Sequence, residues 1–169
     1  RVTAILEKAL QKSDLVLLSG GISVGDYDFV LQAAQACAVK TLFYKVKQKP
    51  GKPLYFGKKG EKIVFGLPGN PSSTLTCFYL YVIPALEKLS HRKPVARILP
   101  VPLSKPIQKA AGLTHFLKGF YDGNVVSVLD AQESYRLSSF ARANCLIRID
   151  EETTSVNKGD LVDVYLFPQ

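Results

Sequence analysis

The chain has 169 residues, 47% hydrophobic and 21% charged, which is the composition of an ordinary globular protein. Its net charge of +8 favours anionic partners, but its Lys and Arg residues are scattered and form no nucleic-acid-binding signature. Because no apolar run reaches the roughly 18 residues that cross a bilayer, composition and charge exclude a membrane span and disfavour nucleic acid as the partner.

The three cysteines Cys37, Cys77 and Cys145 are far apart and include no CxxC pair. This pattern predicts buried thiols in a reducing compartment, rather than disulfides or a metal site, and therefore a cytoplasmic protein. The chain begins with Arg inside a helical pattern and contains no Met, so we expect it to be a piece of a longer protein.

Helical spacing of apolar residues predicts a helix over residues 1–12, followed by a strand in the aliphatic run 15–18. Four consecutive aliphatic residues are typical of a strand covered on both faces. A glycine-containing loop, a helix over about residues 27–38 and a strand in VKTLFYKVKQ come next. This order predicts an α/β fold with a helix-covered, mostly parallel sheet.

The segment PLYFGKKGEKIVFGL predicts a hairpin of residues 54–56 and 63–65, with a turn at 58–60. A long helix is expected from Pro71 to about His91, with Asn70 as its N-cap and a kink at Pro84. After the proline-rich segment HRKPVARILPVPLSKP only short strand patterns follow. They predict a small all-β, barrel-like domain over residues 95–169, after an α/β domain over residues 1–94.

Three loops of the predicted α/β domain suit an anion. In SGGISVGDYD, Gly20 and Gly21 allow close approach of a ligand, Ser23 offers a hydroxyl, and a helix N-terminus follows. The alternative is a simple turn capped by Asp26. Asp28 is a Mg²⁺ ligand, an acceptor that orients the ligand, or a solvated acid at the helix start.

The second loop is basic. In an extended strand Lys45, Lys47 and Lys49 project to one face, and Lys52 follows a Pro-Gly turn. These lysines form either a wall for a polyanion or the charged surface of an edge strand. The third loop, GLPGNP at residues 66–71, is rigid and precedes a helix N-terminus, although it could be a plain turn. Ligands of open α/β sheets bind at the carboxyl ends of the strands, so we expect the three loops to share one rim.

The order SGGISVGDYD, KPGKP and FGLPGNP, followed by a proline-containing helix and a β domain, closely resembles the molybdopterin molybdenumtransferase family, which includes MoeA and the gephyrin E domain. The resemblance spans nearly the whole chain. It implies a molybdopterin-binding α/β domain, truncated at its N-terminus, and a C-terminal β domain. It also implies insertion of molybdenum from molybdate into adenylylated molybdopterin, with release of AMP and help from Mg²⁺.

The resemblance also implies residue roles. Asp28 matches the functional acid of the family and would hold Mg²⁺, while Lys45 and Lys49 match basic active-site positions; we expect these three to be catalytic. Lys118 would have a lesser basic role. The expected substrate-binding residues are Gly20, Gly21, Ser23, Val24, Gly25, Lys52, Pro68, Gly69, Asn70, Pro71, Ser138, Ser139 and Arg142.

The resemblance further implies that N-terminal domains outside this chain supply most of the dimer contacts in the parent protein. We therefore expect the full-length parent to be a homodimer and this chain to bind ligand weakly without turnover. A non-catalytic scaffold or receptor-anchoring protein, or a pterin-binding module, is the alternative. His91 and His115 show no ligand-like spacing and are expected to be structural.

Overall fold

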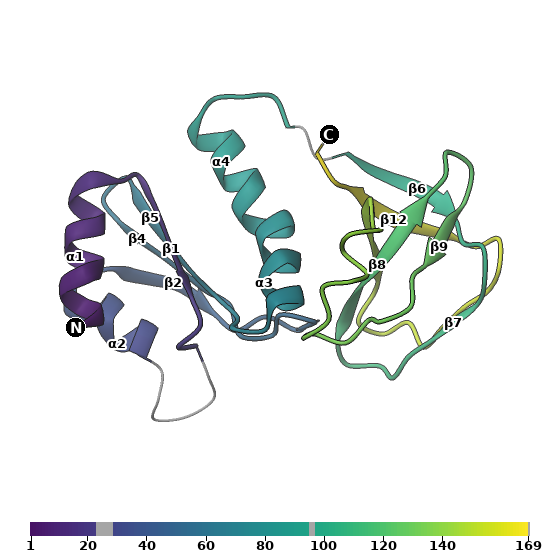
Figure 1. Ribbon diagram of the computed structural model, residues 1–169, viewed down its shortest axis with the longest axis horizontal. Coiled ribbons are helices and arrows are strands. Elements are labelled where there is room, and N and C mark those ends of the chain that lie inside the picture. Colours follow the sequence, from purple (N-terminus) through teal and green to yellow (C-terminus); the bar gives the residue numbers. More distant parts are fainter. Residues whose placement is uncertain (23–28, 95–96, 169) are drawn as a thin grey trace.

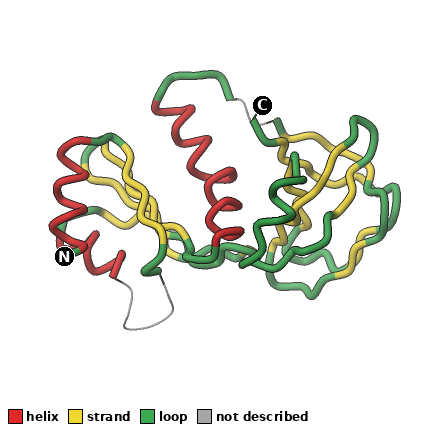
Figure 2. Tube along the Cα trace, viewed as in Figure 1, coloured by secondary structure: helices red, strands yellow, loops and turns green. Residues whose placement is uncertain are grey.

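The computed structural model describes residues 1–22, 29–94 and 97–168. Two sheets lie side by side, and a long helical segment rises between them (Figures 1 and 2). The first body contains α1 (Val2–Lys12), β1 (Leu15–Ser19), α2 (Phe29–Ala36), β2 (Lys40–Tyr44), β4 (Tyr55–Lys59) and β5 (Lys62–Leu67). None of the helices in these residues is long and apolar enough to cross a membrane.

The first sheet has the strand order β1-β5-β4-β2. Only β1 and β5 run parallel, whereas β5 with β4 and β4 with β2 are antiparallel. The α/β class is confirmed, but the expectation of a mostly parallel sheet is wrong. The reason is the predicted hairpin, which forms as β4 and β5 and reverses the chain within the sheet; β2 then adds to it in the antiparallel sense.

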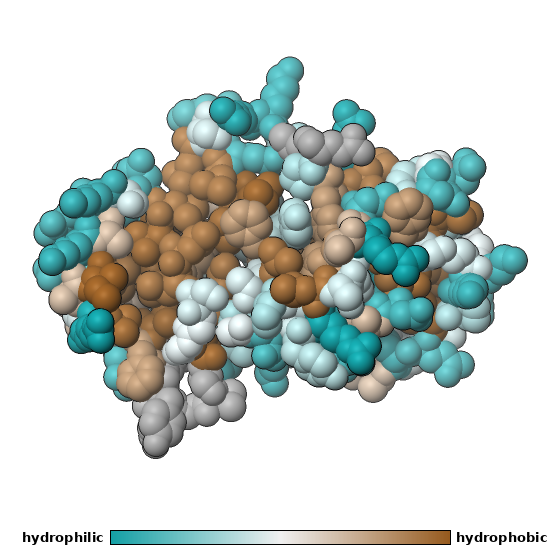
Figure 3. Space-filling model, viewed as in Figure 1, coloured by the Kyte–Doolittle hydropathy of each residue, from teal (hydrophilic) through white to brown (hydrophobic). Residues whose placement is uncertain are grey.

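Helices cover both faces of this sheet unevenly. Val16 of β1 packs with α1 and α2, and Leu15 belongs to the cluster under the long helical segment. Leu17, two residues further on the same face, is 40% exposed because β1 lies at the sheet edge. The expectation that this strand is covered on both faces is therefore wrong at Leu17. Figure 3 shows apolar surface over this part of the molecule.

The long helical segment consists of α3 (Pro71–Cys77), the π-helical turn η1 (Phe78–Val82) and α4 (Ile83–Leu89). The π-helical turn ends two residues before Pro84, whose ring removes one backbone donor, and the predicted kink at Pro84 stays a prediction. Asn70 is the N-cap residue, as predicted, but its side chain does not cap the helix and bonds elsewhere.

The second sheet has the order β3-β8-β10-β12-β6, with β9 paired to β8 and a separate β7–β11 pair. This confirms a β-rich C-terminal region, while its description as barrel-like stays a prediction. The strands are β6 (Ile98–Pro102), β7 (Ile107–Gln108), β8 (Thr114–Tyr121), β9 (Val126–Val128), β10 (Cys145–Ile149), β11 (Ser155–Val156) and β12 (Leu161–Leu166).

The short strand β3 (Gln48–Lys49) comes from the first half of the chain, yet it pairs in parallel with β8 of the second sheet. A domain boundary at residues 94 and 95 remains a prediction, and β3 crosses it. The predicted lysine-rich loop is thereby held against the second sheet.

Candidate functional site

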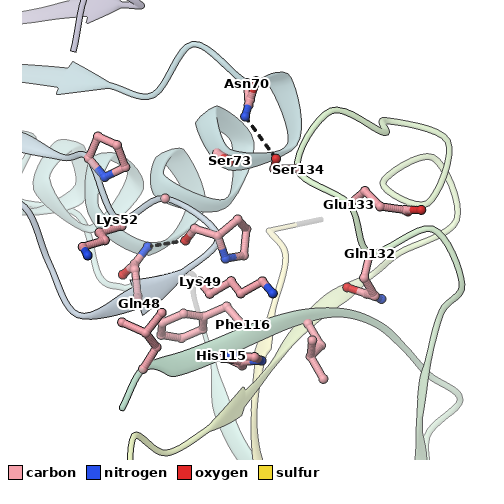
Figure 4. A pocket seen from close by; sticks show the side chains of 15 residues that line it. Gln48, Lys49, Lys52, Asn70, Ser73, His115, Phe116, Gln132, Glu133 and Ser134 are labelled. Carbon is pink, nitrogen blue, oxygen red and sulfur yellow. Dashed lines mark hydrogen bonds between the residues drawn. The ribbon is translucent and has the colours of Figure 1, made fainter. Parts of the chain in front are cut away.

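A cavity of about 390 Å³ lies where the two halves of the chain meet. Four segments form it: β3 with the turn after it, the start of α3, the start of β8, and a loop at residues 132–134 (Figure 4). The lining residues are Gln48, Lys49, Pro50, Gly51, Lys52, Pro53, Asn70, Ser73, Leu113, His115, Phe116, Leu117, Gln132, Glu133 and Ser134.

The turn that carries Lys49 and Lys52 is held from behind by a buried glutamine. The side-chain amide of Gln48 donates to the carbonyl of Pro50 at 3.0 Å, and its oxygen accepts a hydrogen bond from the hydroxyl of Tyr81 in η1. Because Gln48 is only 3% exposed, these bonds have no competition from water. The two lysines are therefore presented to the cavity by a fixed backbone.

Gly51 lets this turn sit against α3. Its φ is +91°, and a Cβ at this position would lie 2.5 Å from Cys77 Sγ and 2.9 Å from Gln48 Nε2. Burial raises the pKa of the Cys77 thiol to about 12, so Cys77 is a neutral packing partner rather than a nucleophile. The three cysteines are free and buried, as predicted.

The opposite wall depends on Lys118, which is 2% exposed. Its ammonium donates to Ser72 Oγ at 3.1 Å, to the carbonyl of Ala131 at 2.7 Å and to that of Arg136 at 3.3 Å. Burial lowers the pKa of Lys118, and the carboxylate of Glu133 opposes this shift. Lys118 thus ties the loop over residues 131–136 to α3.

Two more bonds complete this connection. Asn70 Nδ2 donates to Ser134 Oγ at 3.0 Å, drawn as a dashed line in Figure 4, and the backbone N–H of Ser72 donates to the carbonyl of Ser134 at 3.1 Å. The start of α3 and the loop therefore form one continuous wall.

The described lining of the cavity is basic. Lys49 and Lys52 are its ammonium groups, and His115 adds an imidazole. Glu133 is the carboxylate among these lining residues, and it lies 3.7 Å from the guanidinium of Arg136. A cavity with this charge and with hydroxyl and amide donors suits a small oxyanion.

The two glycine-containing loops meet beside the cavity. Ser19 at the end of β1 pairs with Leu67 at the end of β5, and a Cβ on Gly69 would lie 3.6 Å from the Cα of Gly20. Gly20 and Gly21 have φ values of +77° and +68°, in the left-handed region that favours glycine. Asn70 joins this rim to the cavity.

Comparison with known proteins agrees with this geometry. Residues 1–88 match a family described as "probable molybdopterin binding domain", and residues 100–167 match the family described as "MoeA C-terminal region (domain IV)". The chain belongs to the MoeA family.

Relatives from several organisms share this similarity. The molybdopterin molybdenumtransferases of Haemophilus influenzae and Staphylococcus epidermidis are each 34% identical to it, over 94% and 96% of this chain. The chain spans 41% and 40% of their lengths. A crystal structure of a molybdopterin biosynthesis MoeA protein from Pyrococcus horikoshii matches 99% of the chain and 41% of its own, with a TM-score of 0.80 and 28% identity.

The MoeA-family chain brings only some of the expected site residues together. Lys49, Lys52 and Asn70 line the cavity, and Gly20, Gly21 and Gly69 lie on the rim beside it. Ser23, Val24, Gly25 and Asp28 lie outside the described residues. Pro68, Pro71, Lys45, Lys118, Ser138, Ser139 and Arg142 do not line the cavity.

The expected row of three lysines on one strand face does not exist. Lys45 has a φ of +68°, which ends the extended conformation after β2. Its ammonium lies over the ring of Tyr44, 4.9 Å from the centroid, while Lys47 forms an ion pair with Glu151 at 2.7 Å. Lys49 alone of the three enters the cavity.

In the C-terminal half the site residues lie earlier in the sequence than expected. Ser139 is buried and donates to the carbonyl of Ala131 at 2.8 Å, and Ser138 and Arg142 are exposed. The cavity is lined instead by Gln132, Glu133 and Ser134. The polar run AQES that contains them was the sequence feature that could have indicated their role. The residues that sequence reasoning missed are Gln48, Ser73, His115, Gln132, Glu133 and Ser134.

Proposed function

We propose that the chain is the substrate-binding part of a molybdopterin molybdenumtransferase, which inserts molybdenum from molybdate into adenylylated molybdopterin and releases AMP. The observation that carries this proposal is the basic cavity that Lys49 and Lys52 line at the joint between the two halves, next to the rim formed by the two glycine-containing loops. The names of the curated relatives support the same chemistry.

The proposal assigns different anions to the two parts of the site. Molybdate is a small dianion and fits the basic cavity, where Lys49 and Lys52 offset its charge and Asn70 and Ser73 offer polar groups. The pterin phosphate would lie along the rim of Gly20 and Gly69, where backbone can approach closely. The lysines would then reduce repulsion between two anions that must meet before the dithiolene sulfurs take up molybdenum.

Mg²⁺ is proposed from the resemblance alone and would polarise the phosphoanhydride that is cleaved. The described residues contain no group of three or more His, Cys, Asp or Glu side chains that could hold it. Within the described lining only Glu133 offers a carboxylate, and Arg136 lies beside it. These residues do not fit a metal site by themselves, and the proposed ligand Asp28 is outside them.

We further infer a cytoplasmic, homodimeric parent protein. The free, buried thiols of Cys37, Cys77 and Cys145 support a reducing compartment. Leu17 of β1 and Leu86 and Leu89 of α4 are exposed apolar side chains, which support a covering partner.

The test is calorimetric titration of the chain with molybdate, with Lys49→Ala and the control Lys45→Ala. We expect saturable binding that weakens about tenfold or more in Lys49→Ala, equivalent to about 1.4 kcal/mol. Lys45→Ala should bind as the unmodified chain does, because Lys45 lies outside the cavity lining. Equal affinity of all three proteins would refute the assignment of the cavity. A parallel titration with adenylylated molybdopterin and Mg²⁺ tests the rim.

A further inference from the structure

We propose that His115 takes up a proton when the cavity binds its oxyanion, so that an imidazolium joins Lys49 and Lys52 as a third cation around the bound anion. This inference rests on the proposed function, because it assumes that the cavity holds an oxyanion. It assigns a binding role to a residue that the sequence pattern indicated to be structural.

The sheet register brings the two side chains together. Lys49 of β3 pairs directly with His115 of β8 in the parallel ladder, so both side chains project from the same face of the sheet. Both line the cavity, and Figure 4 shows them along one side of it, with Gln132 and Glu133 across from them. The imidazole has no hydrogen-bond partner in the described part of the chain, so its nitrogens are available to a ligand.

The groups around His115 keep it neutral in the empty cavity. Burial, the charge of Lys109 and the charge of Lys49 lower its pKa, in this order of size. Lys109 precedes β8 and donates to the carbonyls of Leu113 and Glu151 at 3.0 and 2.9 Å. From β10 the register partner is the apolar Ile149.

Across the cavity the facing charged group is Glu133, which is shared with Arg136. At the ring of His115, repulsion from the ammonium groups of Lys49 and Lys109 therefore exceeds attraction from the one carboxylate, Glu133, which is paired. Without a bound anion, the pKa of His115 therefore lies below the ordinary value of 6.5, and the ring is uncharged near pH 7.

A bound dianion reverses this balance. It cancels the repulsion from Lys49 and favours the protonated ring, so the pKa of His115 rises on binding. By linkage, binding takes up a proton at pH values between the free and the bound pKa, and affinity increases as pH falls through that interval. Of the described lining residues, His115 is the one whose ordinary pKa lies near neutrality.

A direct test is an NMR titration of the histidine ring protons between about pH 5 and 8, without and with molybdate. The chain has two histidines, and the other, His91, is exposed after α4, so His91→Asn assigns the signals. We expect the His115 pKa to rise with molybdate while that of His91 stays constant. An unchanged His115 pKa at saturating molybdate would overturn the inference.

Calorimetry gives an independent readout. Titration of molybdate near pH 7 in two buffers of different ionisation enthalpy should reveal proton uptake by the unmodified chain and by His91→Asn, and none by His115→Asn. Affinity should rise as pH falls, by at most about tenfold per pH unit, the limit for one proton. Equal proton uptake in His115→Asn would overturn the inference but leave the proposed function standing. Absence of molybdate binding in the unmodified chain would overturn both.

Discussion

Lys118 shows how one residue can shape the site without entering it. A fully buried ammonium is costly unless its donors are satisfied, and here it has three oxygen partners and, among the described residues, no carboxylate in ion-pair distance. Its ammonium also lies 5.6 Å from the ring centroid of Phe140, a further favourable contact. The hydrogen bonds of Lys118 therefore replace the hydration that its ammonium loses on burial. They connect β8 to α3 and to the loop over residues 131–136.

We predict that Lys118→Met, which keeps the length of the side chain, lowers the free energy of unfolding by about 1–3 kcal/mol, because Ser72 Oγ and two carbonyls lose a buried donor. Urea unfolding measures this loss, with exposed Lys105→Met as the matched control. Molybdate affinity should fall as well, since the loop carrying Ser134 loses the two bonds that its carbonyls accept from Lys118. A variant as stable as the control would show that packing, not these bonds, holds the loop.

At the scale of elements, sequence patterns within one segment predicted the helices and turns that depend on residues of that segment alone. The helix α1, the β4–β5 hairpin and the start of α3 at Pro71 follow from periodicity and turn residues. Strand β3 was not predictable, because a single left-handed residue, Lys45, ends β2, and the two residues of β3 are ordered by pairing with a distant strand.

The same distinction applies to the site. Lys49, Lys52 and Asn70 were accessible from sequence because a lysine-rich turn and a helix start are local features. His115 and Ser134 enter the cavity only through the β3–β8 ladder and the bonds to α3, which connect residues far apart in the chain. Spacing within one segment contains no information about such contacts.

The π-helical turn η1 acts on the site through Tyr81, and we predict that Tyr81→Phe weakens it. Loss of the hydroxyl leaves buried Gln48 Oε1 without this donor, which should cost about 1–3 kcal/mol in the free energy of unfolding. Burial raises the pKa of Tyr81 to about 12, so the hydroxyl remains a donor throughout the neutral range and the loss should not vary between about pH 6 and 9.

Tyr79→Phe is the matched control for this prediction, because it keeps the ring stacked on Phe167 and its hydroxyl has no bond within the described residues. Urea unfolding and molybdate titration of both variants provide the comparison. Molybdate affinity should fall in Tyr81→Phe only, since Gln48 fixes the turn of Lys49. Equal losses in both variants would rule out a specific role for the Tyr81 hydroxyl.

At the scale of the whole molecule, the cavity depends on a joint between two sheets. The β3–β8 pair and the bonds of Lys118 and Asn70 hold one end of this joint. An aromatic stack forms a further contact: the ring of Phe167 after β12 lies 4.0 Å from that of Tyr79 in η1, between centroids, and 5.9 Å from that of Phe140. A ligand that touches both halves should therefore stabilise them together.

We predict that Phe167→Ala loosens this joint, lowering the free energy of unfolding by about 1–3 kcal/mol through lost stacking and burial. Phe120→Ala is the control, because Phe120 on β8 is 46% exposed. Hydrogen exchange should report similar opening free energies for α1 and β10 in the unmodified chain, and different ones in Phe167→Ala. Saturating molybdate should bring the two values together again, since an anion bound in the proposed site would contact both halves. If exchange in the two elements stays coupled in Phe167→Ala, the ladder and the polar bonds suffice, and the stack contributes stability without coupling the sheets.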